Sequence, residues 1–259
     1  MKKRNLLFIP FLFGMGIGFW GCNIMGGKNV QSYPAAPAVI DFNSDMGCTA
    51  ISSQWGYAAA PDLALFEGNF AILSFTLDFD NQPSSQYYTA SAISISETGP
   101  IRSLEFASGP VAVGDFTLPI SDVGWNLWAD GGSTSPFYNG TIFMGIACKD
   151  NAPNIRMVYN TQEPDSAGIK NLYLLAQPLS SSNTDVAKNY AFDLFSLFQN
   201  FGRDTTFLSN AGETSTYRYL KVNLKYLSKI SDDGVPTYTT TGLSPMLLYM
   251  FQSQPADLF

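Results

Sequence analysis

The sequence predicts an all-β fold, and three observations favour this class. Apolar and polar residues alternate in short segments along most of the chain, which is the pattern of half-buried strands. Clusters of Gly, Pro, Asn and Ser separate these segments at fairly regular intervals, as in sandwiches and small barrels. Residues 189–201 form the single segment whose apolar side chains have helical spacing.

The first predicted element is a β-hairpin. Residues 70–80 begin with a short apolar run, then alternate, and stop at the turn formers of residues 81–85. Residues 87–96 return with small and β-branched side chains, and the pair Gly99 and Pro100 ends that strand. The two segments therefore predict two antiparallel strands joined by a turn.

The remaining strands are predicted from the same alternation. The clearest pattern lies in residues 217–228, where Leu220, Val222, Leu224 and Tyr226 share one face and polar or charged residues share the other. This pattern is typical of a strand with one buried and one solvated side. The other predicted strands are residues 101–107, 112–119, 141–148, 154–159 and 171–176.

Two segments near the C-terminus keep alternatives open. Residues 189–201 predict either a helix capped by Asn189 and ended by Gly202, or a strand followed by a short turn. The apolar tail, residues 246–259, is expected either to pack as a last strand or to stay loose.

The N-terminal residues have the features of a secretory signal. Three basic residues, Lys2, Lys3 and Arg4, precede an apolar stretch over residues 6–20. Pro10 and several glycines interrupt this stretch, which is shorter than a membrane-spanning helix requires. We therefore expect residues 1–21 to be a cleaved signal peptide.

The cut site resembles the lipobox of bacterial lipoproteins at Gly21 and Cys22, whereas Phe19 fits only the looser forms found in gut-type two-membrane bacteria. The resemblance implies that Cys22 is lipidated and anchors the protein, since buried acyl chains hold a protein on a bilayer. Residues 22–38 are then expected to be a flexible tether, with folding from Val39. We expect an outer-membrane lipoprotein, on the periplasmic face because no acidic run follows Cys22.

Charge and composition exclude several functions. The chain has 21 acidic and 14 basic residues, and removal of residues 1–21 takes away three of the basic ones. Outside the signal there is no basic cluster of the kind that binds nucleic acid, so this class of partner is excluded. The sequence contains no histidine, which removes the commonest general base and metal ligand. We expect a protein without catalytic residues, cofactor or metal centre.

Two groups of residues remain as candidate ligand sites. Trp125, Trp128 and Tyr138 surround a Gly- and Ser-rich loop and are candidates for stacking on sugar rings, although core packing is the commoner use of such aromatics. Asp78 and Asp80 stand at alternate positions, so they are candidate calcium ligands or, more often at a strand end, turn-forming acids.

Two further cysteines, Cys48 and Cys148, are expected to be small buried side chains in preference to a disulfide.

The order of apolar segments resembles that of the NigD-like lipoproteins. The resemblance rests on Gly140-Thr-Ile-Phe-Met-Gly-Ile, Ile155-Arg-Met-Val-Tyr, Leu172-Tyr-Leu-Leu, Phe192-Asp-Leu and Val222-Asn-Leu-Lys-Tyr. It implies a small OB-like barrel followed by an immunoglobulin-like β-sandwich, which we expect at residues 39–122 and 123–259. It further implies a cell-envelope protein with no catalytic residues to carry over.

The sequence therefore predicts a non-catalytic binding or structural module on the cell envelope. Two alternatives remain, a surface glycan-binding module and a fimbrial or adhesin-type subunit whose candidate donor strand is residues 246–251. The expected partners are the membrane, through Cys22, and a glycan or an envelope protein.

Overall fold

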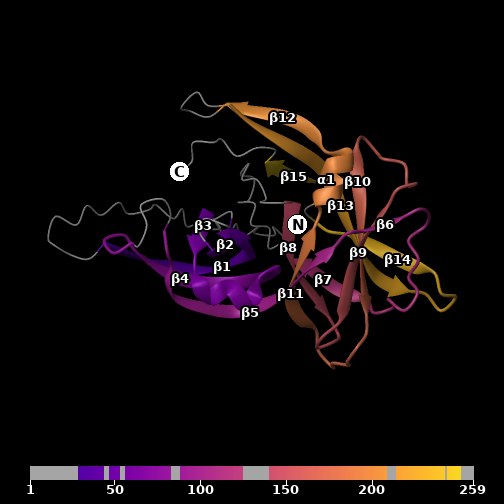
Figure 1. The fold of residues 1–259 in the computed structure, drawn as a ribbon. Helices are drawn as coiled ribbons and strands as arrows, with labels where there is room; N and C mark the ends of the chain where they lie inside the picture. Colours follow the sequence, from indigo (N-terminus) through magenta and orange to yellow (C-terminus); the bar gives the residue numbers. More distant parts are fainter. Residues whose placement is uncertain are drawn as a thin grey trace, which may run out of the picture.

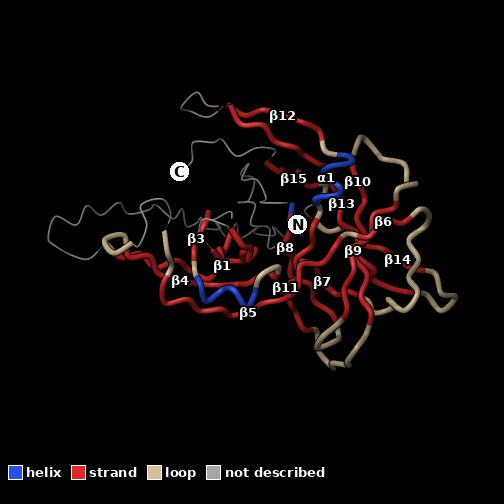
Figure 2. The backbone as a smooth tube through the Cα atoms, in the orientation of Figure 1, coloured by secondary structure: helices blue, strands red, loops and turns tan. Residues whose placement is uncertain are grey.

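A computed structural model describes residues 29–43, 47–52, 56–82, 88–124, 140–208, 214–242 and 244–251. In this part of the chain nearly all regular structure is β, arranged in an eight-stranded and a seven-stranded sheet, so the predicted all-β class is confirmed (Figures 1 and 2). None of the helices among these residues is long and apolar enough to cross a membrane.

The first body is built by the N-terminal strands, drawn in indigo and purple in Figure 1. Its strands follow the order β3-β2-β1-β4-β5 with antiparallel neighbours. Hydrogen bonds between Ala59 and the residues at 88 and 90 close this sheet on itself, giving a small barrel-like body. The elements are β1 (Val30–Asn43), β2 (Gly47–Ser52), β3 (Gly56–Ala59), the 3-10 helix η1 (Pro61–Phe66), β4 (Asn69–Asp78) and β5 (Ser91–Ser103).

The core of this body follows from the alternation in β4. Leu73, Phe75 and Leu77 are buried on one face of the strand, and Leu63 of η1 packs into the same core. The predicted hairpin is confirmed, because β4 pairs antiparallel with β5.

Two predicted boundaries in this region were wrong. β1 begins at Val30 and pairs with β4 from that residue, so residues 30–38 belong to the sheet and not to a tether. The prolines of this segment suggested a linker, but Ala38 is buried and Tyr33 stacks on Phe75 at 4.8 Å between ring centroids. In addition, β5 continues through Pro100 instead of ending there.

The second body is a sandwich of two sheets. One sheet contains the end of β5 with β11 (Val186–Asp193), β8 (Thr141–Cys148) and β7 (Ile120–Gly124). The facing sheet has the order β12-β13-β10-β9-β6, with β14 and β15 also paired to β13. These strands are β12 (Arg203–Leu208), β13 (Thr214–Ile230), β10 (Ile169–Gln177), β9 (Asn154–Asn160), β6 (Glu105–Ala107), β14 (Pro236–Thr240) and β15 (Met246–Phe251).

A single apolar core joins the two sheets of the sandwich. Ile142, Met144 and Phe192 from one sheet share this core with Leu172 and Val222 from the other. The predicted faces of β13 are confirmed, since Leu220, Val222 and Leu224 are buried.

The structure resolves the open alternatives in the second half. Residues 189–201 comprise the end of β11 followed by a short helix, α1 (Phe195–Phe201), so the strand interpretation was nearer than one continuous helix. The tail segment Met246–Phe251 is a strand of the chain's own sheet, paired with β13. Residues 112–119, predicted as a strand, are irregular and contribute an isolated bridge from Leu118 to Ala176.

β5 is shared by the two bodies. Its first part pairs with β4, and its last residues, 101–103, pair in parallel with β11. A small apolar cluster of Phe70, Phe143 and Ala191 lies at this junction. The division into independently folding units at residues 39–122 and 123–259 stays a prediction. In the structure, the chain passes from the first core to the second within β5.

Candidate functional site

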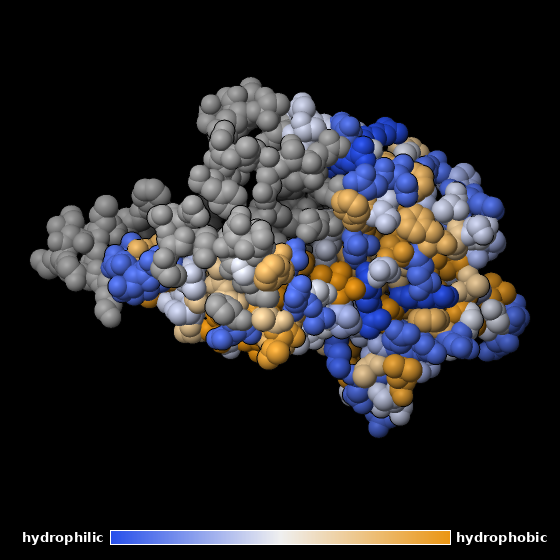
Figure 3. Space-filling model, viewed as in Figure 1, coloured by the Kyte–Doolittle hydropathy of each residue, from blue (hydrophilic) through white to orange (hydrophobic). Residues whose placement is uncertain are grey.

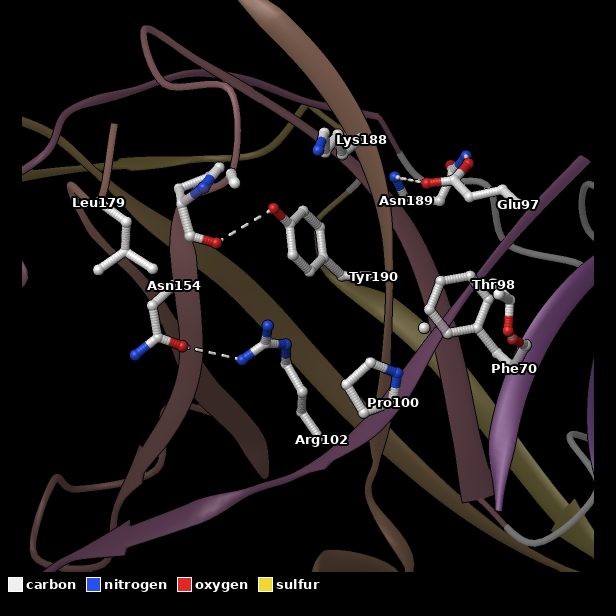
Figure 4. A pocket seen from close by; sticks show the side chains of 13 residues that line it. Phe70, Glu97, Thr98, Pro100, Arg102, Asn154, Leu179, Lys188, Asn189 and Tyr190 are labelled. Atoms are coloured by element: carbon white, nitrogen blue, oxygen red, sulfur yellow. Dashed lines mark hydrogen bonds between the residues drawn. The ribbon is translucent and has the colours of Figure 1, made fainter. Parts of the chain in front are cut away.

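A pocket of about 500 Å³ opens where β5 and β11 diverge (Figure 4). The strands pair through residues 101–103 and 191–193, and the residues before these pairs, 97–100 and 188–190, form two walls of the pocket. The loop residues Ala152 and Pro153, Asn154 at the start of β9, and Leu179 complete its rim. The pocket, which we call the fork pocket, therefore lies at the strand that both bodies share.

Glu97 and Asn189 connect the two walls of the fork pocket. The backbone N–H of Asn189 donates to Glu97 Oε1 at 3.1 Å, and its side-chain Nδ2 donates to Glu97 Oε2 at 2.5 Å. The carboxylate thus takes the position that a carbonyl of a neighbouring strand would occupy. A backbone donor on this edge of β11 is therefore oriented to bind a carboxylate oxygen.

Arg102 supplies a positive charge at the other end of the pocket. Its Nη1 donates to Asn154 Oδ1 at 2.9 Å and to the carbonyl oxygen of Ile155 at 3.0 Å, while Nε is buried without a partner. Both acceptors are neutral groups. Among the ion pairs of the described residues none involves Arg102, so its charge is balanced by no carboxylate in direct contact.

Tyr190 forms a rigid wall between these two polar pairs, as Figure 4 shows. The Arg102 guanidinium lies 5.5 Å from the centroid of the Tyr190 ring. The Tyr190 hydroxyl donates to the carbonyl oxygen of Pro153 at 3.4 Å. Burial raises the pKa of Tyr190 to about 12. The phenol is therefore neutral at physiological pH and acts as a donor and an apolar surface.

A buried carboxylate holds the rim of the pocket. Asp150 is fully buried and accepts hydrogen bonds from the backbone N–H groups of Ala152, Leu179 and Ser180 and from the Ser180 hydroxyl, at 2.7 to 2.9 Å. Burial alone would raise the pKa of Asp150, but these four hydrogen bonds outweigh it and hold the pKa below its usual value. Asp150 thereby fixes two rim loops against each other.

Phe70 and Gly99 shape the side of the pocket nearest the first body. The Phe70 ring packs so closely that a Cβ added at Gly99 would lie 2.9 Å from its Cε1 atom. The same ring meets Phe143 edge-on at 6.1 Å between centroids. An aromatic surface held by both bodies therefore forms part of the lining.

At two other polar sites the charged side chains form ion pairs. A second pocket of about 350 Å³ lies beside β6, and there the Arg156 guanidinium contacts Glu105 at 3.4 Å. On the facing sheet, Glu163 accepts hydrogen bonds from Tyr173 at 2.8 Å and Lys225 at 3.4 Å. Burial and the neighbouring Glu163 raise the pKa of Tyr173. Because the charged groups at each place contact one another, we assign them a role in stabilising the fold.

The candidate calcium ligands form a turn. Asp78 accepts hydrogen bonds from the Asp80 backbone N–H at 3.1 Å and from the Asn81 amide at 2.9 Å, and Asp80 accepts one from the Asn29 backbone N–H at 2.8 Å. Within the described residues no group of three or more acidic, cysteine or histidine side chains could hold a metal ion. The turn role that the sequence favoured accounts for these contacts.

Most other predicted site residues lie outside the described part of the chain. These are the lipidation residue Cys22 and the candidate aromatic platform Trp125, Trp128 and Tyr138. Cys148 is buried and has a free thiol, so it forms no bridge with Cys48.

The fork pocket was not predicted from the sequence. Its polar residues come from β5, β9 and β11, which are far apart along the chain. The one available signal was Gly99-Pro100, two turn formers inside a segment that otherwise continues as a strand. The surface in Figure 3 mixes hydrophilic and apolar residues over the sandwich, so surface hydropathy gives no stronger signal.

Comparisons with known proteins address the fold. No family model matches the sequence, and no curated protein does. The crystal structure of an uncharacterized protein from Parabacteroides merdae matches with a TM-score of 0.57 and 15% identity, over 86% of this chain and 100% of that chain. That similarity shows a common fold.

Two further structures match at lower scores. A candidate lipoprotein from Bacteroides fragilis has a TM-score of 0.49 and 12% identity, over 86% of this chain and 99% of that chain. A NigD-like immunity protein from Bacteroides caccae has a TM-score of 0.45 and 11% identity, over 88% of this chain and 100% of that chain. The chain thus shares the fold of the Parabacteroides merdae protein.

Proposed function

We propose that this protein is an exported, lipid-anchored envelope protein that binds a ligand in the fork pocket without chemical conversion. The main evidence for a ligand site is the pocket of about 500 Å³ between the two bodies. Ligand sites occur preferentially at such junctions and in this size range. Cys22 at the end of the predicted signal peptide supports the anchor. The periplasmic face of an outer membrane is the proposed location.

The chemistry of the pocket supports binding over catalysis. Glu97 is engaged by Asn189, and Arg102 is engaged by Asn154 and a carbonyl oxygen, so both of these groups help to position the walls. The sequence offers no histidine that could act as a general base. Fixed polar groups beside Phe70 and Tyr190 are suited to orient a ligand that the aromatic surfaces cover.

The alternative of a fimbrial subunit needs a strand that is free to be donated. The segment proposed for this part, β15, pairs with β13 of the same chain over residues 246–251, and Leu248 is fully buried. This pairing favours the binding module over the fimbrial subunit.

A ligand panel tests the proposed function. The detergent-solubilised mature protein is mixed separately with envelope oligosaccharides, short peptides and uronic-acid sugars, and the midpoint of thermal unfolding is measured. At least one class should raise the midpoint, because a ligand that binds only the native state stabilises it. The substitution Thr98→Trp, at an exposed position of the lining, should fill the pocket and abolish the shift. A panel without any shift, or a shift unchanged in Thr98→Trp, would contradict the proposal.

A further inference from the structure

We infer that the ligand of the fork pocket is a short acidic peptide, an inference that rests on the proposed function of this site. The evidence is the excess of cations over acids in the lining of the pocket and the two strand edges that form its walls.

The side chains that line the pocket carry one more positive than negative charge on an acidic protein, and the ionised Asp150 behind the rim is not part of this lining. The whole chain has a net charge of −7, yet the charged residues that line the pocket are one acid, Glu97, and two cations, Arg102 and Lys188. Neither cation has an ion pair among the described residues. A ligand with more carboxylates than ammonium groups would complement this set, because charge complementarity favours and orients binding.

The walls of the pocket favour a peptide backbone. They are segments of two strands, 97–100 of β5 and 188–190 of β11, that run in parallel toward their pairing at residues 101–103 and 191–193. An extended peptide recognises such strand edges through its own N–H and C=O groups, while its side chains enter neighbouring pockets.

Glu97 occupies the backbone N–H of Asn189, so Arg102 and Lys188 are the lining groups left to receive carboxylates of a ligand. The backbone N–H of Asn189 donates to a carboxylate oxygen of Glu97, at 3.1 Å, in the direction of the opposite wall. Farther along, the Arg102 guanidinium and the exposed Lys188 are placed to receive carboxylates of the ligand, and Tyr190 separates them from each other in the view of Figure 4. Glu97 can still accept a hydrogen bond from a ligand ammonium or amide group, since a carboxylate has about four acceptor positions.

Isothermal titration calorimetry with three peptides tests the inference on the mature protein. The probes are tri-glutamate, tri-glycine and tri-lysine. Tri-glutamate should bind, tri-glycine should bind about tenfold more weakly, and tri-lysine should give no measurable heat. Affinity for tri-glutamate should fall as salt rises, because exposed charges are screened.

A charge-reversal pair serves as the control for the pocket. Lys188→Glu turns the exposed cation of the pocket into an acid, and it should weaken tri-glutamate binding about tenfold. Lys229→Glu makes the same change at an exposed site on β13 that does not line the pocket, and it should leave the affinity within about twofold.

The outcomes separate this inference from the proposed function. Equal binding of tri-lysine, or equal effects of the two lysine variants, would overturn the acidic-peptide inference. Preferential binding of a uronic-acid disaccharide that Thr98→Trp abolishes would also overturn it, while leaving the pocket as the ligand site. If no member of the panel binds, both the inference and the proposed function fail.

Discussion

At the scale of single residues, Gly99 of β5 and Phe70 of β4 are cross-strand partners beside the junction of the two bodies. Phe70 is buried at the junction with Phe143 and Ala191, and Gly99 leaves the space that its ring occupies. Glycine is required here by this close approach, because any larger residue places an atom against the ring. Because both residues line the fork pocket, this contact helps to shape it.

Gly99→Ala should therefore destabilise the protein by about 1–3 kcal/mol, the usual cost of overpacking. The added methyl group would meet Phe70 Cε1 at 2.9 Å, so the ring or β5 must move. Gly109→Ala is the matched control, because a Cβ there meets nothing within 4 Å, and it should change the free energy of unfolding by less than about 0.5 kcal/mol. Urea unfolding measures both, and equal effects would contradict the account.

Asp150 predicts an acid-sensitive contribution to stability. Its hydrogen bonds hold the folded-state pKa below the value of an unfolded aspartate, about 3.9, so the contribution is complete above that pH. It is lost as the pH falls through the folded-state pKa. In Asp150→Asn, an amide NH₂ faces backbone donors, so the urea midpoint should drop at pH 7 and the gap to the unmodified protein should narrow toward pH 2.5.

The control for this experiment is the exposed Asp232, where the same change should shift the urea midpoint little at any pH. A gap between Asp150→Asn and the unmodified protein that stays constant from pH 7 to pH 2.5 would rule out the proposed role of the carboxylate.

The residues of the fork pocket show where sequence reasoning ends. Asp150 stands in a polar loop sequence, Lys149 to Pro153, and nothing in that sequence distinguishes a buried acceptor from a solvated acid. Glu97 and Asn189 meet although 92 positions separate them. Such contacts depend on how strands that are distant in sequence come together, which local patterns do not specify.

At the scale of elements, α1 covers one end of the sandwich core. It has only seven residues, so its stability comes from the side chains it buries and not from intrinsic propensity. Leu197 and Phe198 are fully buried, whereas Phe195 on the same helix is 44% exposed. The helix is therefore held against the core by the face that contains Leu197 and Phe198.

Phe198→Ala should cost about 3–5 kcal/mol in the free energy of unfolding, as expected for removal of a buried aromatic side chain. The same substitution at Phe195 should cost less than about 1 kcal/mol, because much of that side chain stays in water. Chemical unfolding of both variants compares them directly. Similar losses would show that α1 is not anchored through its buried face.

β1 yields a prediction about where the folded part begins. Residues 30–38 pair with β4, and Tyr33 stacks on Phe75, so these residues stabilise the first body. A protein shortened to begin at Val39 should unfold at a lower temperature than one beginning at Asn29, by several degrees in a thermal scan. Identical midpoints would restore residues 30–38 to the tether that their prolines suggested.

Most strands were predictable because each buries one face. The alternation in residues 70–80 and 217–228 places strands correctly, since period-two burial leaves a direct trace in sequence. The prediction that β5 ends at Pro100 was wrong for a physical reason. Pairing with β4 stops at Pro100 and pairing with β11 starts at Ile101, so the proline stands where the strand changes partners.

At the scale of the whole molecule, two cores share one strand and a small apolar junction. The first core contains Leu73 and Phe75, the second contains Met144 and Phe192, and the junction cluster around Phe70 lies between them. The fork pocket occupies the place where the shared strand leaves one sheet partner for the other. A ligand there would contact both bodies at once, which is why the proposed binding function is assigned to this place.

The proposal of a ligand-binding protein held on a membrane by Cys22 is checked at the anchor itself. The mass of the mature protein should correspond to a chain that begins at Cys22 and carries acyl groups, and detergent-phase partitioning should show it with the membrane lipoproteins. Cys22→Ser should abolish lipid labelling and move the protein to the aqueous phase. The described residues should keep the same thermal unfolding. An unmodified terminus, or membrane retention undiminished in Cys22→Ser, would contradict the claim.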